Sequence, residues 1–350
     1  MPHTFNFMAT GIGSLPLTDP DSAAALSLKY LAEAPIWPQL PKRDFRELMA
    51  EQYSEMLPGI RLDEAKRHFY FDTAADLTPE LEVFFQQYLD KNYGFFKITE
   101  LYAAGFYALV RALQRSCPPG IRFIKGHITG PLTAGVSFKD SNGRDIIHNE
   151  TVYDALVKGL AMKAAWQIRE LTRFNRPVII FIDEPAMESL GSAFSAVSSE
   201  TVAEKLNEII DTIHEMGGLA GIHCCGNADW PMLFNTRVDI VNFDAFGYME
   251  KVLLYPGDLK KFYGRGGTLA WGIVPTGDFT GKETSGGLIS KLEEGFRRIE
   301  PAGVSPDILH RQCILTPACG MGSLSPEKAE AILKLLKEVS YSMKKKYAMG

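Results

Sequence analysis

The chain has 350 residues, of which 46% are hydrophobic and 23% are charged, and its formal net charge is −5. This composition is typical of a globular protein with a large core. No run of like charges extends beyond the lysines at 344–346, so we expect no nucleic-acid partner and no binding to an anionic membrane. Neither a secretory signal nor a membrane-spanning stretch is evident, so we expect a cytoplasmic protein.

The five cysteines are odd in number and unevenly spread, which does not suggest a disulfide framework. In a reducing compartment such thiols stay free for metal binding or catalysis. Cys117 lies in a loop-like segment and Cys313 in an apolar run, and we expect both to be structural.

The first third of the chain gives weak structural signals. Residues 8–12 predict a first strand that opens into a Gly-rich turn, and 19–34 predict a helix with aspartate caps. The segment 36–41 contains too many prolines for a helix or a central strand, so we expect a surface or active-site loop. The other predicted elements are helices over 42–57, 79–88 and 99–115 and a weak strand over 69–71.

From residue 122 onward, strands and helices alternate regularly. The apolar run 177–185 suits a strand buried on both faces. Counting 8–12 as the first, about eight strands predict a single α/β domain over 1–350, a (β/α)8 TIM-type barrel. An open doubly wound sheet is the alternative, but no Gly-x-Gly-x-x-Gly follows the first strand. The remaining predictions are strands over 122–129, 219–223, 239–244, 268–274 and 313–315 and helices over 150–174, 199–216, 230–235, 256–263, 285–299 and 325–346.

An imidazole and a thiol stand two residues apart in the segment 221–227. Side chains at i and i+2 share a face of a strand, so His223 and Cys225 can bind one metal ion while Cys224 points into the wall. Cys319 follows another strand-like run. Zinc takes thiolate and imidazole ligands, and catalytic zinc sites keep one position open. We therefore predict a catalytic zinc site formed by His223, Cys225 and Cys319. The alternatives are an ordinary buried thiol–imidazole pair and a closed structural zinc site.

Several polar residues lie at the carboxyl ends of predicted strands, where barrel enzymes gather their catalytic groups. His127 is a candidate to hydrogen-bond a substrate, although a lone histidine is more often structural. Asp183 and Glu184 are candidates for substrate binding, or they form an ion pair or cap a helix. The candidates at such ends are Ser14, His127, Asp183, Glu184, His223, Cys225, Asp244 and Cys319.

Four motifs together resemble the superfamily that joins cobalamin-independent methionine synthase and uroporphyrinogen decarboxylase. The form His-x-Cys-Gly-Asn is especially similar to the zinc methyltransferases that move methyl groups between a corrinoid and a thiol such as coenzyme M. The resemblance runs through nearly the whole chain, in order. The motifs are Ile12-Gly13-Ser14, Ile182-Asp183-Glu184-Pro185-Ala186, His223-Cys224-Cys225-Gly226-Asn227 and Pro317-Ala318-Cys319-Gly320.

The resemblance implies a barrel that holds zinc through His223, Cys225 and Cys319. Methionine synthases add a Glu at the end of the strand that follows, and Asp244 stands at the matching place, as a fourth ligand or a hydrogen-bond partner of the ligands. Two cysteinates cancel the charge of Zn²⁺ and make it a feeble Lewis acid toward water, while a bound substrate thiolate keeps its electron density. This ligand set favours alkyl transfer to sulfur over hydrolysis.

By the same match, Asp183 is the residue that would hold the amino group of a homocysteine-like substrate. Ser14 and the backbone around Gly13 would bind its carboxylate. Glu184 is a further substrate-binding candidate, and His127 a further catalytic one. Ser14 and Gly13 also have a plainer interpretation, as a turn cap and a residue required by the backbone.

A full cobalamin-independent methionine synthase has two barrels, and this chain has room for one. A folate donor would lose much of its site, so we expect a methyl-corrinoid, held by a corrinoid carrier protein, to be the donor. The predicted activity is S-methylation of a homocysteine-like or coenzyme M-like thiol, as in methionine biosynthesis. Two alternatives remain: a metal-independent lyase like uroporphyrinogen decarboxylase, which Cys225 and Cys319 argue against, and a non-catalytic barrel that docks a corrinoid protein.

Overall fold

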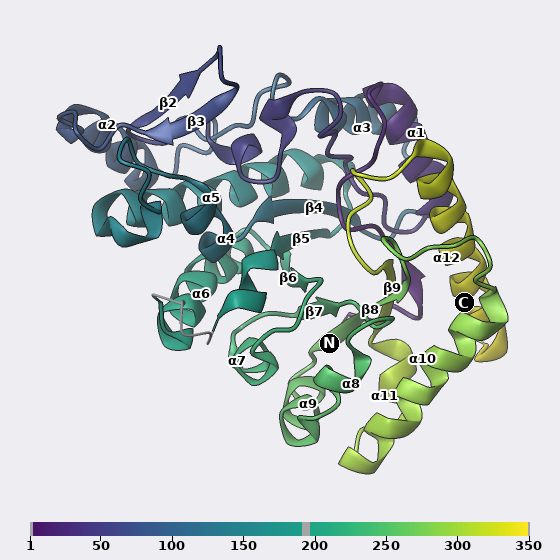
Figure 1. Ribbon diagram of the computed structural model, residues 1–350. Helices are drawn as coiled ribbons and strands as arrows, with labels where there is room; N and C mark the ends of the chain where they lie inside the picture. Colours follow the sequence, from purple (N-terminus) through teal and green to yellow (C-terminus); the bar gives the residue numbers. More distant parts are fainter. Residues whose placement is uncertain (1–2, 191–196, 349–350) are drawn as a thin grey trace.

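The computed structural model describes residues 3–190 and 197–348, and these form an α/β TIM-type barrel (Figure 1). Parallel strands make one curled sheet of seven strands in the order β1-β9-β8-β7-β6-β5-β4. From β4 to β9, each strand pairs with the next in sequence, as repeated strand–helix units require. The strands are β1 (Met8–Ala9), β4 (Ile124–Thr129), β5 (Val178–Asp183), β6 (Leu219–Cys224), β7 (Ile240–Phe243), β8 (Thr268–Val274) and β9 (Cys313–Pro317).

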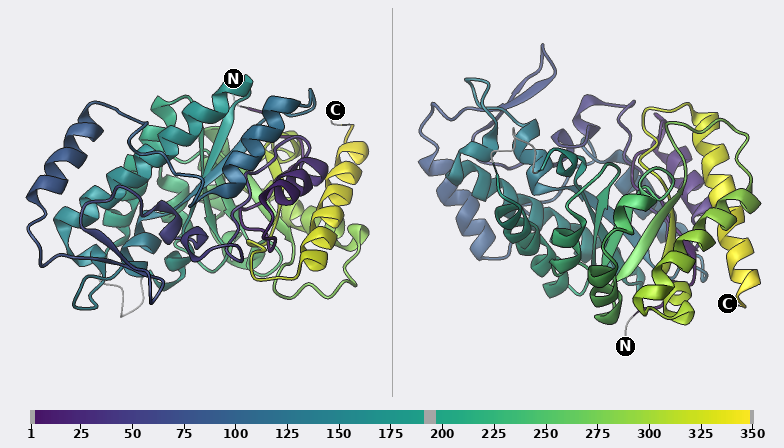
Figure 2. Two further views of the ribbon diagram at one scale, coloured as in Figure 1. Left: turned by 90° about the horizontal axis from the view of Figure 1, so that it is seen from above. Right: turned by 60° about the horizontal axis from the view of Figure 1, so that its bottom comes forward.

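Helices connect the strands and cover the outside of the sheet (Figure 2). Side-chain caps mark several helix starts: Asn149 accepts from Val152 N before α5, and Ser325 accepts from Lys328 N before α12. No helix in the described ranges is long and apolar enough to cross a membrane. The helices are α1 (Pro20–Tyr30), α2 (Thr78–Leu89), α3 (Ala104–Arg115), α4 (Pro131–Ser137), α5 (Glu150–Leu171), α6 (Ser199–Glu215), α7 (Trp230–Asn235), α8 (Met249–Val252), α9 (Pro256–Gly264), α10 (Ser285–Ile299), α11 (Pro306–Arg311) and α12 (Pro326–Lys346).

Two separate hydrophobic clusters occupy the two faces of the sheet. Side chains alternate along a strand, and in β5 Ile179 and Phe181 belong to the small cluster while Ile180 and Ile182 belong to the large one. The small cluster therefore fills the barrel interior, and the large one lies between the sheet and the helices. Burial on both faces explains why β5 is continuously apolar until Asp183 at its carboxyl end.

The segment 35–39 lies between the two edges of the sheet. Trp37 N donates to the carbonyl of Lys125 in β4 (3.3 Å), and Gln39 N donates to the carbonyl of Gly13 after β1 (3.1 Å). The segment was predicted as a surface or active-site loop. It lies in the barrel wall and not on the surface, and Gln39 lines the cavity described below. The prolines are tolerated there because the donating N–H groups belong to other residues. The predicted count of eight barrel strands, which included 69–71, is not confirmed in the described residues: the sheet has seven strands, and the segment 35–39 makes only isolated bridges to its edges.

An antiparallel hairpin stands outside the barrel, beside α2 in Figure 1. It consists of β2 (Ile60–Asp63) and β3 (His68–Phe71). The strand predicted over 69–71 therefore exists, but it is not a barrel strand.

Two helix predictions in the first third of the chain need correction. The stretch 42–57 holds short 3₁₀ helices over Phe45–Glu47 and Glu51–Tyr53 in place of one long helix. The backbone is extended at Leu48 and has a positive φ at Met56, and both conformations interrupt a helix. The helix predicted over 99–115 begins later, as α3.

Candidate metal centre and adjoining cavity

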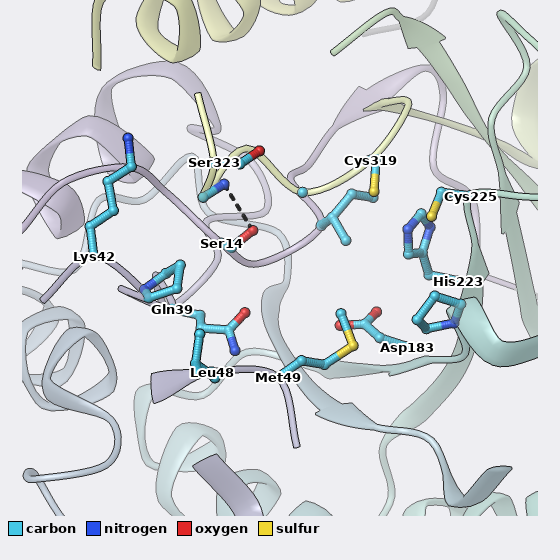
Figure 3. Close-up of a pocket in the computed structure, with 15 residues that line it drawn as sticks. Ser14, Gln39, Lys42, Leu48, Met49, Asp183, His223, Cys225, Cys319 and Ser323 are labelled. Carbon is cyan, nitrogen blue, oxygen red and sulfur yellow. Dashed lines mark hydrogen bonds between the residues drawn. The ribbon is translucent and has the colours of Figure 1, made fainter. Parts of the chain in front are cut away.

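Three ligand-type side chains meet at the carboxyl ends of β6 and β9. His223 lies in β6, Cys225 follows that strand, and Cys319 follows β9. One ligand atom from each lies within 4.8 Å of the other two, and Figure 3 shows the imidazole and both sulfurs facing the same space. Cys224 packs into the outer hydrophobic cluster, as strand alternation predicts. Within the described ranges, this is the one group of three His, Cys, Asp or Glu side chains with such geometry.

Asn242 fixes the orientation of the His223 ring. The two residues lie opposite each other on β7 and β6. Asn242 Nδ2 donates to the carbonyl of Ala270 and to Thr316 Oγ1, each at 2.8 Å. Its Oδ1 is therefore left to accept from His223 Nδ1, at 2.5 Å. The Nε2 of His223 is buried and has no hydrogen-bond partner among the described residues, which is how metal-binding histidines are held in proteins.

The charges of the three side chains depend on one another. The neighbouring thiol of Cys319, and next the imidazole of His223, lower the pKa of Cys225 to about 4. Its contact with Cys225, together with burial, raises the pKa of Cys319, because a second thiolate beside the first is repelled. Burial lowers the pKa of His223, but Cys225 and Asp183 outweigh it and raise that pKa. A divalent cation would relieve this repulsion and ionise both thiols, so the donor set fits zinc.

Asp244 does not join the three ligands in this arrangement. Its Oδ1 accepts from Phe246 N and Gly247 N, each at 2.8 Å, in the turn that follows β7. Burial raises the pKa of Asp244, and these two hydrogen bonds oppose that effect. Because the turn occupies Oδ1, the fourth ligand that the resemblance implies would have to be Oδ2 of Asp244.

The three ligand residues form part of the wall of a cavity of about 400 Å³. Ser14 lies in another part of the wall, where its Oγ accepts from Gly322 N at 3.1 Å (Figure 3). The volume suits a molecule of amino-acid size. The apolar residues in the wall are Ile12, Pro41, Leu48, Met49 and Pro185.

Asp183 is the acidic side chain in the cavity wall. It ends β5 opposite His223 and is 7% exposed, and its Oδ1 has no hydrogen-bond partner among the described residues. Burial raises the pKa of Asp183 to about 6, although His223 and Lys125 act to lower it. A buried carboxylate without a partner is costly unless a cationic group arrives, so Asp183 is suited to bind one.

Glu184 lies outside the cavity wall and caps α4. Its Oε1 accepts from Leu132 N (2.9 Å), and its Oε2 accepts from Thr133 N (2.9 Å) and Thr133 Oγ1 (2.6 Å). A Cβ at Gly130 would lie 2.1 Å from the carboxyl carbon of Glu184, so only glycine fits there. Glu184 thus caps a helix, which was one of the alternatives to substrate binding, and it pairs N–H groups that have no partner within the helix.

His127 is buried beneath the loop that follows β1, and neither it nor Gly13 lines the cavity. Its ring stacks on Trp37 with the ring centroids 3.8 Å apart. A Cβ at Gly13 would lie 2.9 Å from the His127 ring, so Gly13 permits this close packing. Burial, and next the charge of Lys125, lowers the pKa of His127. These positions indicate packing. The catalytic role of His127 stays a prediction, since neither ring nitrogen has a hydrogen-bond partner among the described residues.

Asn242 and Lys125 were not among the candidates from the sequence, although a signal for both was present. Asn242 interrupts the apolar run of β7, and Lys125 begins an alternation with His127 and Thr129 in β4. In strands that are buried throughout, a polar residue at an inward position has to serve a neighbour or a ligand.

Comparisons with known proteins bear on the fold. No family model and no curated protein matches the sequence. A solved B12-independent methionine synthase from Shewanella sp. W3-18-1, in complex with selenomethionine, is similar with a TM-score of 0.61 and 14% identity, over 98% of this chain and 99% of that one. A methyltransferase from Methanosarcina mazei has a TM-score of 0.54 and 14% identity, over 94% of this chain and 86% of that one. The chain shares their fold. At this level the resemblance drawn from the motifs is confirmed.

Proposed function

We propose that this chain is a zinc-dependent methyltransferase that methylates the sulfur of a thiol, with a methyl-corrinoid as donor. The observation that carries the proposal is the meeting of His223, Cys225 and Cys319 at one cavity, with Asn242 holding the imidazole so that Nε2 faces the thiols. Two solved structures with this fold are named as a methionine synthase and a methyltransferase, which supports the same class of enzyme.

The three residues would hold one Zn²⁺ and leave a position for the substrate sulfur. When bound, the ion supplies positive charge that keeps a thiol in its thiolate form. The thiolates of Cys225 and Cys319 offset the charge of the cation, so the residues create a nearly neutral site. Such a site suits a sulfur nucleophile better than it suits the activation of water.

The cavity favours a thiol that also carries an ammonium and a carboxylate group, such as homocysteine. Asp183 places a buried negative charge beside the metal ligands, and Ser14 offers a hydroxyl in another part of the wall. Leu48 and Met49 supply apolar contacts for the carbon chain between the charged groups. A coenzyme M-like thiol lacks the ammonium group and would leave Asp183 without a partner, so we rank it second.

Two methyl donors are possible for this site. A methyl-corrinoid is favoured because one barrel offers an incomplete site for a folate. Against this, the Shewanella structure is named B12-independent although nearly its whole length is covered by this chain. A methyl-folate is therefore the competing donor in the experiment.

The test is to incubate zinc-loaded protein with homocysteine and either methylcobalamin or a methyl-folate, and to measure the S-methylated product. We expect about one zinc per chain and product from methylcobalamin, with loss of both in Cys225→Ser and Cys319→Ser variants. A corrinoid carrier protein replaces free methylcobalamin if the reaction is slow. Metal-free protein that stays folded and decarboxylates a porphyrinogen would support the lyase, and corrinoid-protein binding without methyl transfer would support the docking barrel. Either result overturns the proposal.

A further inference from the structure

A lysine lies inside the barrel beneath the cavity. Lys125 is in β4, and its side chain is completely buried. Its Nζ donates to the carbonyl of Ile12 at 2.5 Å and lies 4.1 Å from the centroid of the Phe181 ring. A buried ammonium group is unfavourable unless nearby charges and hydrogen bonds compensate it, so its presence requires an explanation.

The ring beneath this ammonium group locates it relative to Asp183. Phe181 and Asp183 are two residues apart in β5 and therefore face the same side of the strand. Strand residues rise about 3.3 Å each, so the Lys125 Nζ lies roughly one interior layer below the Asp183 carboxylate. Burial lowers the pKa of Lys125 to about 7, although the charge of Asp183 acts to raise it. The Oδ1 of Asp183 accepts no hydrogen bond in the described part of the chain, so Lys125 does not occupy it.

The hydrogen bond to Ile12 connects the same lysine to the loop that carries Ser14. Ile12 and Ser14 both line the cavity, and Ser14 is the residue assigned above to the substrate carboxylate. Lys125 therefore contacts one side of the acceptor subsite by a hydrogen bond and influences the other side by its charge.

We propose that Lys125 is a positioning residue of the acceptor subsite. Its charge balances that of Asp183 from below, and its hydrogen bond holds the Ile12 loop in place. The side of Asp183 that faces the cavity thereby stays available to the ammonium group of an amino-thiol. This inference rests on the proposed function, since it deepens the assignment of the acceptor. It predicts that Lys125 governs selectivity for the amino group and has little effect on the binding of the thiol end.

The chain offers a matched control. Lys163 in α5 is also completely buried, and its Nζ also donates to one backbone carbonyl, that of Glu55, at 2.7 Å. It lies outside the barrel, and burial lowers its pKa to about 8. Loss of a buried lysine can therefore be separated from loss of a charge beneath Asp183.

The experiment measures the Kd of zinc-loaded protein for homocysteine and for 4-mercaptobutanoate, which is the same molecule without the amino group. In Lys125→Met we expect homocysteine binding to weaken roughly tenfold more than 4-mercaptobutanoate binding, with zinc content unchanged. Lys125→Arg should restore part of this preference, and Lys163→Met should leave it as in the wild type. Equal weakening of both ligands, or no change, would overturn the proposal.

A second set of variants keeps the test valid if Lys125→Met alone does not fold. Removing both charges in Lys125→Met/Asp183→Asn avoids leaving either one buried without the other. If the two residues act together, the double variant discriminates between the two ligands no worse than Asp183→Asn alone. Additive losses would show that Lys125 acts independently of Asp183. Wild-type protein that binds neither thiol would overturn the proposed function itself, which distinguishes the two failures.

Discussion

Asn242 and His223 face each other across β7 and β6, with Asn242 Oδ1 accepting from the imidazole Nδ1. The amide is held in this orientation because its Nδ2 donates to Ala270 O and Thr316 Oγ1. Residues of β7, β8 and β9 thereby determine which ring nitrogen of His223 is available to a metal. The candidate centre is thus oriented by the barrel wall as well as by its own ligands.

Replacing Asn242 by leucine should weaken zinc binding by roughly 10- to 100-fold, because the ring of His223 loses the acceptor that holds it. The measurement is competition for zinc with a chromophoric chelator. Asn242→Asp keeps an acceptor for Nδ1 and should retain most of the affinity, whereas Thr316→Val removes one support of the amide and should have a smaller effect. Unchanged affinity in the leucine variant would show that Asn242 does not orient the ligand.

Replacing Ser14 by alanine should raise the KM for the thiol about fivefold and leave the zinc content unchanged. The reason is that the variant loses the hydroxyl assigned to the carboxylate and the acceptor of Gly322 N, each a hydrogen bond of about 1 kcal/mol. Steady-state kinetics with homocysteine provide the measurement. Ser323→Ala is the control, since Ser323 lines the same cavity. A larger effect at Ser323 than at Ser14 would contradict the assignment.

Replacing His127 by phenylalanine should preserve activity to within about threefold, because an aromatic ring at this position keeps the stacking on Trp37. His127→Ala should instead lower the melting temperature by leaving a cavity. The pair of variants separates packing from chemistry: activity lost in a stable phenylalanine variant would restore the catalytic role predicted from the sequence.

The carboxyl group of Glu184 should make stability depend on pH. Burial raises its pKa to about 7, against hydrogen bonds from Thr133 and Leu132. The neutral form thus favours folding, so this contribution is fully present below pH 4.5 and is lost as the pH rises through about 7. At roughly 1.4 kcal/mol per pKa unit, the decline is on the order of 3 kcal/mol.

The measurement for this prediction is the free energy of unfolding in urea at pH 4.5 and pH 8. Glu184→Gln should show a smaller decline between the two pH values than the wild type, and the exposed Glu82→Gln should behave like the wild type. An equal decline in all three proteins would mean that Glu184 is already ionised at the lower pH.

Much of the barrel could be predicted because its strands are buried on both faces. The apolar runs that become β5, β8 and β9 are apparent in the sequence, and polar residues at strand ends mark the mouth. The segment 35–39 could not be predicted as part of the wall, because prolines usually exclude a central position. Its place depends on hydrogen bonds to Lys125 and Gly13, which are remote in sequence.

The candidate site could be predicted in part, for a related reason. His223, Cys225 and Cys319 carry ligand chemistry that is specific enough to be identified from spacing and residue type. Substrate binding and helix capping could not be separated for Glu184, because its partner is the N-terminus of α4, which the sequence did not predict as a helix. Asn242 was missed because its role exists only through the register between β6 and β7.

The most direct test of the central claim is zinc-edge X-ray absorption of the zinc-loaded protein. If His223, Cys225 and Cys319 hold the ion, the spectrum should show two sulfur neighbours at about 2.3 Å and a nitrogen neighbour at about 2.0 Å. The Cys225→Ser and Cys319→Ser variants should lose the zinc at stoichiometric metal, and any zinc that they bind at excess metal should show one sulfur neighbour fewer. A spectrum with only nitrogen and oxygen neighbours, or one that neither variant changes, would contradict the assignment of the metal centre.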